Sequence, residues 1–110
     1  MNFYMGESFE KIDYDRGDVE FEDELLDFIY KMSKREHYNM SALCNINPYG
    51  DTVISQGDLP QIISICNRIL ENDLLERYKD YEGGMKAVRN LHEMSKSALG
   101  SGKGLVVLGD

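Results

Sequence analysis

The sequence predicts an α+β fold in which about three helices pack on one face of a small sheet of short strands. Three segments carry apolar residues at helical spacing, and several short apolar runs flanked by turn residues are typical of strands. With 110 residues, 42% of them hydrophobic and 29% charged, the chain is expected to form a single domain over residues 1–110. We expect an acidic hairpin or loop over residues 1–21 and the core over residues 22–110.

The predicted hairpin covers residues 8–22. Apolar residues precede a turn at residues 15–18, and Val19 and Phe21 alternate with Glu20 and Glu22 after it. Gly17 can adopt the positive φ that such a turn requires. The alternative interpretation is an ordered acidic loop that leads into the first helix.

Apolar periodicity predicts three helices, over residues 22–37, from residue 58 onward, and over about residues 84–99. Asp58 and Gln61 match a capping box, and Pro60 is tolerated in a first helical turn. Glycines from residue 100 onward are expected to end the third helix. The predicted buried faces comprise Leu25, Phe28, Ile29 and Met32 in the first helix, Leu59, Ile62, Ile63, Cys66, Ile69 and Leu70 in the second, and Ala87, Val88, Leu91, Met94 and Ala98 in the third.

Three short apolar runs are predicted to be strands. Residues 41–46 suit a buried strand, residues 52–55 a second strand, and residues 105–108 an apolar strand of the kind found inside a sheet. In the turn between the first two, Pro48 fixes φ, Gly50 permits a left-handed conformation and Asp51 can accept hydrogen bonds from nearby amides. These three residues are therefore predicted to have a structural role, and Tyr49 at the tip is a candidate aromatic anchor for a partner.

The first 30 residues contain ten acids and two bases, so they account for the whole net charge of −8. This asymmetry favours a basic partner, a metal ion or solvation alone. Nucleic acid is not expected as a partner, because phosphate binding needs clustered Lys and Arg. The sequence has no secretory signal and no apolar run long enough to span a membrane. We therefore expect a cytoplasmic protein without a membrane partner, in which Cys44 and Cys66 are reduced and structural.

No motif predicts a metal site or a cofactor. Asp13, Asp15 and Glu24 match positions 1, 3 and 12 of an EF-hand loop, but Gly17 and Asp18 stand at positions 5 and 6, and no helix is expected before the loop. The glycine-rich residues 100–104 lack the spacing of a phosphate loop and follow a helix instead of a strand. Neither match is sufficient to predict a site.

An enzyme is the less favoured interpretation, because no Ser or Cys can be paired with a base from the sequence alone. As the alternative function we consider a small hydrolase or ligand-binding enzyme with a pocket near Asp51, His92 and Asp110.

The second part of the chain contains a Pro-Tyr-Gly-Asp-Thr turn at residues 48–52, a helix that opens near Leu59 and Pro60, and an apolar strand followed by Gly109 and Asp110. With these features, residues 41–110 resemble a group of small uncharacterised bacterial proteins that are similar to immunity proteins of toxin systems. Members of the group carry Asp or Glu where this chain has Asn47. The resemblance implies an immunity or antitoxin function.

The acidic segment and the resemblance together predict a non-enzymatic acidic binding protein of immunity or antitoxin type. Such a protein would neutralise a basic partner protein, for example a toxin. Complementary charge would speed the encounter, and apolar anchors would supply much of the affinity. The predicted contact residues are Asp13, Tyr14, Asp15, Asp18, Glu20, Phe21 and Tyr49.

Overall fold

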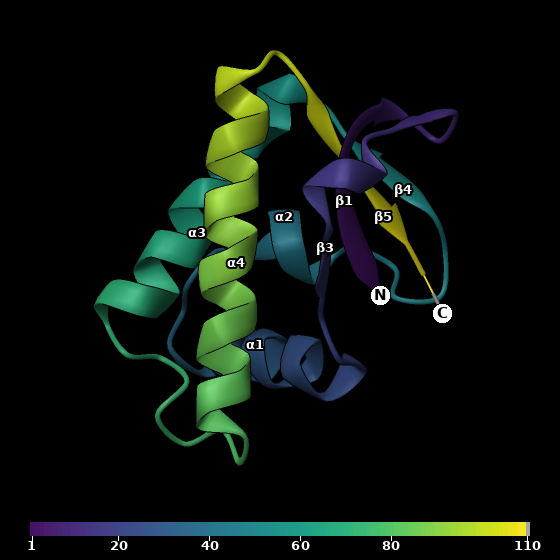
Figure 1. Ribbon diagram of the computed structural model, residues 1–110. Coiled ribbons are helices and arrows are strands. Elements are labelled where there is room, and N and C mark those ends of the chain that lie inside the picture. The colour runs from purple at the N-terminus through teal and green to yellow at the C-terminus, as the bar shows by residue number, and fades with distance from the viewer. Residues whose placement is uncertain (110) are drawn as a thin grey trace.

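The computed structural model describes residues 1–109 and has an α+β fold, as predicted, with four helices packed with a five-stranded antiparallel sheet (Figure 1). The strands are β1 (Asn2–Ser8), β2 (Lys11–Ile12), β3 (Asp18–Glu20), β4 (Thr52–Ile54) and β5 (Gly104–Leu108). The helices are α1 (Asp23–Arg35), α2 (Ser41–Cys44), α3 (Leu59–Glu71) and α4 (Tyr81–Gly100), with the short 3-10 helices η1 (Tyr14–Arg16) and η2 (Gln56–Asp58). The helices gather on one side of the sheet.

Strand β1 lies at the centre of the sheet, whose order is β2-β1-β5-β4. On one side its residues 2–4 pair with β3 and its residues 6–8 pair with β2, and on the other side it pairs with β5. The predicted hairpin over residues 8–22 is therefore wrong, because β3 pairs with β1. The hairpin turn in this part of the chain lies at residues 9–10, between β1 and β2. In this register Val19 lies opposite Phe3, and both side chains are buried, which favours the pairing over a local hairpin.

The predicted strand over residues 41–46 is also wrong, because residues 41–44 form α2. Leu43 and Ile46 are the buried residues here, three positions apart, which suits a helical turn and not the two-residue period of a strand. The Asn39 side-chain oxygen accepts hydrogen bonds from the Ser41 amide (3.3 Å) and hydroxyl (2.9 Å) at the start of this turn. Strand β4 pairs with β5 instead, with Val53 opposite Val106.

The three longer helices are confirmed, with differences at their starts. Asp58 forms no capping box, because its carboxylate accepts a hydrogen bond from the Ser55 hydroxyl (3.2 Å) and η2 leads directly into α3. Helix α4 begins three residues earlier than predicted, where the Asp80 carboxylate accepts from the Gly83 amide (3.2 Å) as an N-cap. In α3, Ile65 is fully buried whereas Ile63 is only partly buried.

Helices α1, α3 and α4 end in the same left-handed motif. In each motif one residue adopts a left-handed conformation, and the amide of the residue after it donates a hydrogen bond to a carbonyl five positions earlier in the chain. In α1, the Tyr38 amide donates to the Ser33 carbonyl (2.9 Å). The left-handed positions are held by His37 (φ 60°), Asp73 (φ 51°) and Gly102 (φ 70°). The glycine-rich stop predicted for the last helix is thus confirmed, and two of the three positions carry residues that are strained in this conformation.

The hydrophobic core lies between the helices and the sheet face that carries Phe3, Met5, Leu105 and Val107. Both cysteines are free, and Cys66 is fully buried within this core. Burial raises the pKa of the Cys66 thiol from 9.0 to about 12, so this side chain acts as a small neutral core residue, as predicted.

Candidate functional site

The sheet has a second face, which points away from the helices. Tyr4 of β1, Val106 of β5 and Val53 of β4 are neighbours across the strands, while their neighbours in sequence contribute to the helix-covered core. Because successive side chains of a strand point to opposite faces, these three point outward. We define the open face as this surface, which consists of Asn2, Tyr4, Asp18, Glu20, Val53 and Leu108, with Tyr14 resting on Tyr4. Val106 points to the same side between Tyr4 and Val53, but its side chain is fully buried.

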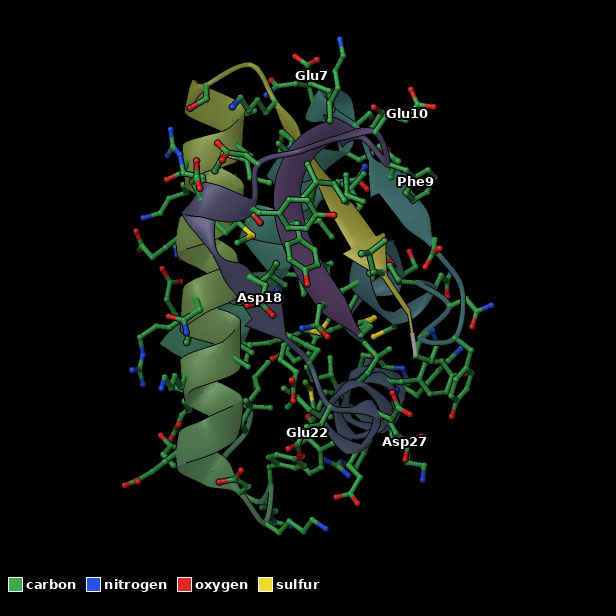
Figure 2. All side chains as sticks on the ribbon, turned by 45° about the vertical axis from the view of Figure 1, so that its right-hand side comes forward. Glu7, Phe9, Glu10, Asp18, Glu22 and Asp27 are labelled. Atoms are coloured by element: carbon green, nitrogen blue, oxygen red, sulfur yellow. The ribbon has the colours of Figure 1, made fainter. Side chains whose placement is uncertain are left out.

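Exposed aromatic side chains occur on the open face and at its end. Tyr14 of η1 is 65% exposed, and its ring meets that of Tyr4 edge to face with the centroids 5.5 Å apart. Phe9, in the turn between β1 and β2, is 50% exposed, and Figure 2 shows it at one end of the sheet beside Glu10. Apolar surface of this kind beside charged groups is typical of interaction sites. The sequence did not single out Tyr4 or Phe9, although the alternation of Tyr4 with buried neighbours is the signal that would have placed it outward.

Three of the predicted contact acids are exposed on the open face or in η1. Asp18 and Glu20 lie on the open face because Val19 between them points into the core, and Asp15 lies in η1 next to Tyr14. Among residues 1–109, none of the three makes an ion pair, and the Asp18 carboxylate accepts a hydrogen bond from the Asn2 side-chain amide. These carboxylates are therefore available to a cation outside the chain.

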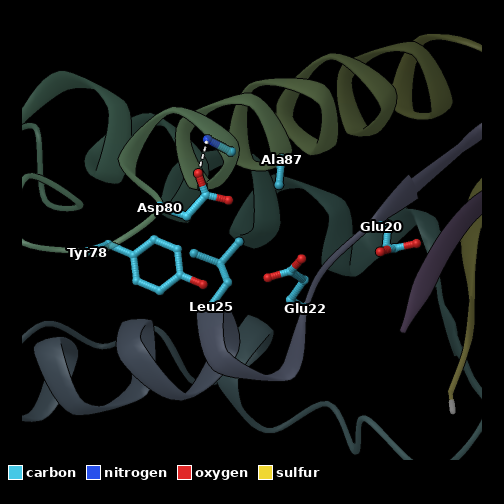
Figure 3. Close-up of a pocket in the computed structure, with 8 residues that line it drawn as sticks. Glu20, Glu22, Leu25, Tyr78, Asp80 and Ala87 are labelled. Carbon is cyan, nitrogen blue, oxygen red and sulfur yellow. Dashed lines mark hydrogen bonds between the residues drawn. The ribbon is translucent and has the colours of Figure 1, made fainter.

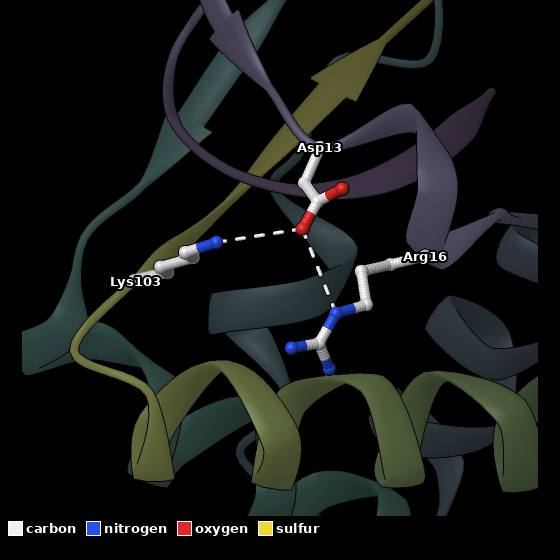
Figure 4. A network of polar contacts seen from close by, with 3 residues as sticks. All are labelled: Asp13, Arg16 and Lys103. Atoms are coloured by element: carbon white, nitrogen blue, oxygen red, sulfur yellow. Dashed lines mark hydrogen bonds and ion pairs between the residues drawn. The ribbon is translucent and has the colours of Figure 1, made fainter.

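Asp13, the fourth predicted acid, has its charge balanced inside the molecule. Its Oδ2 atom lies 3.4 Å from Lys103 Nζ and 3.5 Å from Arg16 Nε, and the three side chains form one network (Figure 4). Lys103 comes from the loop before β5, so this contact joins η1 to the other end of the chain. Asp13 is itself partly buried, so these ion pairs favour a structural role for its carboxylate.

Phe21 is wrongly predicted as a contact residue, because its side chain is fully buried. Its ring packs edge to face on Phe3 with the centroids 5.5 Å apart, and its carbonyl accepts a hydrogen bond from the amino group of Met1 (3.1 Å). Tyr49 is 71% exposed, as an anchor requires. Tyr49 and Phe9 lie at opposite ends of the sheet. Tyr49 precedes β4, whose first residue, Thr52, pairs with Val107 near the start of β1, whereas Phe9 follows the end of β1.

The turn at residues 47–51 holds the end of the last strand. The Asp51 carboxylate accepts a hydrogen bond from the Gly109 amide (3.1 Å), and a Cβ on Gly109 would lie 2.4 Å from the Gly50 carbonyl oxygen. The local turn bond predicted for Asp51 is made by Asn47 instead, whose side-chain oxygen accepts from the Tyr49 amide (3.0 Å). These contacts favour the structural interpretation of the turn.

A small pocket opens where β3, α1 and α4 meet (Figure 3). We call it the acidic pocket, a cavity of about 100 Å³ with Glu20, Glu22 and Asp80 at its rim and Leu25, Tyr78, Gly83, Gly84 and Ala87 as its walls. The Tyr78 ring also contacts the Phe28 ring, with the centroids 5.1 Å apart. The sequence analysis missed Tyr78 and Asp80, which lie in a polar stretch without a motif.

In the described residues, Asp51 and His92 of the alternative enzyme site make contacts with other groups and not with each other. The Asp51 carboxylate accepts a hydrogen bond from the Gly109 amide, and His92 is a partly buried residue of α4 with Nδ1 3.9 Å from Glu93 Oε1. Neither residue lines the acidic pocket. Asp110, the third predicted residue, lies outside the described residues. Within residues 1–109, no three His, Cys, Asp or Glu side chains are grouped so that they could hold a metal ion.

Comparison with protein-family models, with curated proteins and with solved structures finds no match to this chain. In residues 1–109, no helix has the length and apolar character needed to cross a membrane.

Proposed function

We propose that this chain is a non-enzymatic acidic binding protein that docks a basic partner protein on its open face. The observation that carries the proposal is exposed Tyr14 on the open face together with the carboxylates of Asp15, Asp18 and Glu20, which make no ion pair in the described residues, while exposed Phe9 adds an apolar group at the end of the sheet. An aromatic centre with a charged rim is the composition that protein interfaces use. The resemblance of residues 41–110 to small uncharacterised bacterial proteins that are similar to immunity proteins is the reason to propose a partner of toxin type.

The two kinds of side chain would act at different stages of binding. Carboxylates on one face attract a basic surface over distances up to the Debye length of about 10 Å in 0.1 M salt, which raises the association rate. Tyr14 and Phe9 then lose their water contact, and burial of such rings supplies most of the affinity and slows dissociation.

The experiment uses two open-face variants of the full chain as affinity baits in a lysate of the cells in which it occurs. The first variant combines Phe9→Ser and Tyr14→Ser. The second combines Asp15→Asn, Asp18→Asn and Glu20→Gln. The matched control for charge is Glu71→Gln with Glu76→Gln and Glu82→Gln, which removes as many exposed acids from the helical side.

We expect a basic protein that the wild type and the control retain and that the aromatic variant loses. With the purified partner, the charge variant should associate at least about tenfold more slowly at low salt, and its rate should depend less on salt concentration. Equal capture by the aromatic variant would refute the open face as the docking site. An acidic partner, or equal effects of the charge variant and its control, would refute the role of the carboxylates.

A further inference from the structure

We infer that the acidic pocket binds the guanidinium group of an arginine side chain. The identity of the chain that supplies this arginine rests on the proposed function, which names a basic partner protein. The pocket itself is argued from three observations, which are an unpartnered buried hydroxyl, carboxylates that make no ion pair in the described residues, and apolar lining residues.

The buried hydroxyl belongs to Tyr78. Its side chain is only 7% exposed, and its oxygen is buried without a hydrogen-bond partner among the described residues. Figure 3 shows this hydroxyl on the side of the ring that faces Leu25 and Glu22. Buried polar groups are nearly always hydrogen-bonded in native proteins. The orientation therefore points to a ligand that bonds to this oxygen.

The carboxylates that line the pocket make no ion pair within the described residues. Glu20 and Glu22 make no ion pair among residues 1–109, and Asp80 uses one oxygen to cap α4. Lys79, which lies between Tyr78 and Asp80 in the sequence, forms an ion pair with Glu24, and Glu24 does not line the pocket. Burial raises the pKa of the Tyr78 hydroxyl, as do the negative charges of Glu22, Glu24 and Asp80, while the positive charge of Lys79 opposes them. The carboxylates of Glu20, Glu22 and Asp80 favour a ligand that is a positively charged hydrogen-bond donor.

The shape of the pocket selects guanidinium among such donors. The described carboxylates are not grouped closely enough to hold a metal ion. A guanidinium group is planar and carries five N–H donors, so it can reach separate acceptors while its faces lie against the Tyr78 ring and the Leu25 side chain. An ammonium group is compact and strongly hydrated, and it gains less from apolar walls. The cavity of about 100 Å³ is also far below the ~300 Å³ typical of drug-sized ligands.

The pocket is placed to take this group from a protein docked on the open face. Glu20 belongs to both surfaces, because it ends β3 on the open face and also lines the pocket. An arginine at the edge of the docked partner would therefore reach the pocket over the end of β3. A free guanidinium compound would satisfy the same chemistry, and the experiment separates these two sources.

The test is an NMR titration of the isotope-labelled full chain with N-acetyl-arginine amide. The citrulline and lysine counterparts of this compound serve as the neutral and the ammonium probes. We expect saturable shifts of the Gly83, Gly84 and Ala87 amides with the arginine probe alone. Glu22→Gln and Tyr78→Phe should each weaken its binding by about fivefold. The matched control Asp23→Asn, which changes the charge of the adjacent residue outside the pocket, should leave the binding within about twofold of the wild type.

Each contrary result overturns a stated part of the inference. Absence of saturable shifts, equal shifts with the citrulline probe, or equal weakening by Glu22→Gln and Asp23→Asn would refute a cation site. Equal binding of the lysine probe would refute selection of guanidinium. If the probe binds but does not compete with the purified partner, the ligand is a free compound and the partner's arginine is refuted. Loss of partner binding in the Phe9→Ser/Tyr14→Ser variant tests the proposed function separately, because neither residue lines the pocket.

Discussion

The Tyr78→Phe variant is expected to make the protein more stable, although it removes a hydrogen-bonding group. In the free protein the Tyr78 hydroxyl is buried and has no partner among the described residues. A buried unsatisfied polar group costs about 1–3 kcal/mol of folding free energy. Phenylalanine keeps the ring and its contact with Phe28 while it removes this cost. A stabilising loss of a hydroxyl is the opposite of what most buried tyrosines show, so the sign alone is informative.

The expected magnitude follows from two opposing effects. Removal of the oxygen leaves about 10 Å³ of empty space, which costs roughly 0.2 kcal/mol at about 24 cal/mol per Å³. Subtracted from the roughly 1–3 kcal/mol that the unsatisfied hydroxyl costs, this leaves a net gain of about 1–3 kcal/mol. For a chain of this length, such a gain raises the melting temperature by about 4–8 °C per kcal/mol.

The assay is urea unfolding at pH 7, followed by far-ultraviolet circular dichroism, with Tyr81→Phe as the matched control. The Tyr81 hydroxyl donates a hydrogen bond to the Asp73 carboxylate, so its removal should lower the free energy of unfolding. The two variants carry the same chemical change and are expected to shift stability in opposite directions. A Tyr78→Phe variant that is less stable than the wild type would show that the hydroxyl is bonded in the free protein, and would refute the reasoning.

Two further predictions concern stability. Replacement of His37 by Gly should stabilise the protein by about 1 kcal/mol, because it relieves a left-handed residue at φ 60°; Glu36→Gly, at φ −93°, is the control, and an equal response of both to urea would contradict this reasoning. Because the pKa of the Cys66 thiol is raised from 9.0 to about 12, the unfolded chain ionises first as the pH rises, and stability should fall by about 1.4 kcal/mol between pH 8 and pH 10. Under reducing conditions Cys66→Ala should show a smaller fall over this range, and an equal fall would contradict the assignment.

The sequence was sufficient for the long helices and for β5. In α1, the apolar residues Leu25, Ile29 and Met32 recur with the helical period within one segment, so the signal is complete without any partner. The continuous apolar run of β5 indicates a buried strand for the same reason. These elements depend on residues that are close together in the chain.

The pairing of the strands could not be obtained in this way. Strand β1 pairs with β5, about 100 residues further along, and with β3 through the register that places Phe3 opposite Val19. Residues 41–46 show the related ambiguity, because a short apolar run suits either a strand or one buried helical turn. Such choices depend on which surfaces meet, and that information is not local.

The same division holds for the candidate site. The sequence located the acidic segment and Tyr14, since charge and composition can be counted along the chain. It misplaced Phe21, because alternation shows that two faces differ without showing which one meets the helices. It also missed the acidic pocket, whose residues come from β3, α1 and the start of α4.

By itself, then, the sequence determined that the N-terminal segment carries the net charge and that the rest of the chain contains the main helices and a central strand. Only the tertiary structure decided how that charge is used. It pairs Asp13 with Lys103 and Glu24 with Lys79, and it leaves Asp15, Asp18, Glu20 and Glu22 without a cation in the described chain. The physical reason is that neutralisation requires a base within a few ångströms, and folding sets these distances for residues that are far apart in sequence.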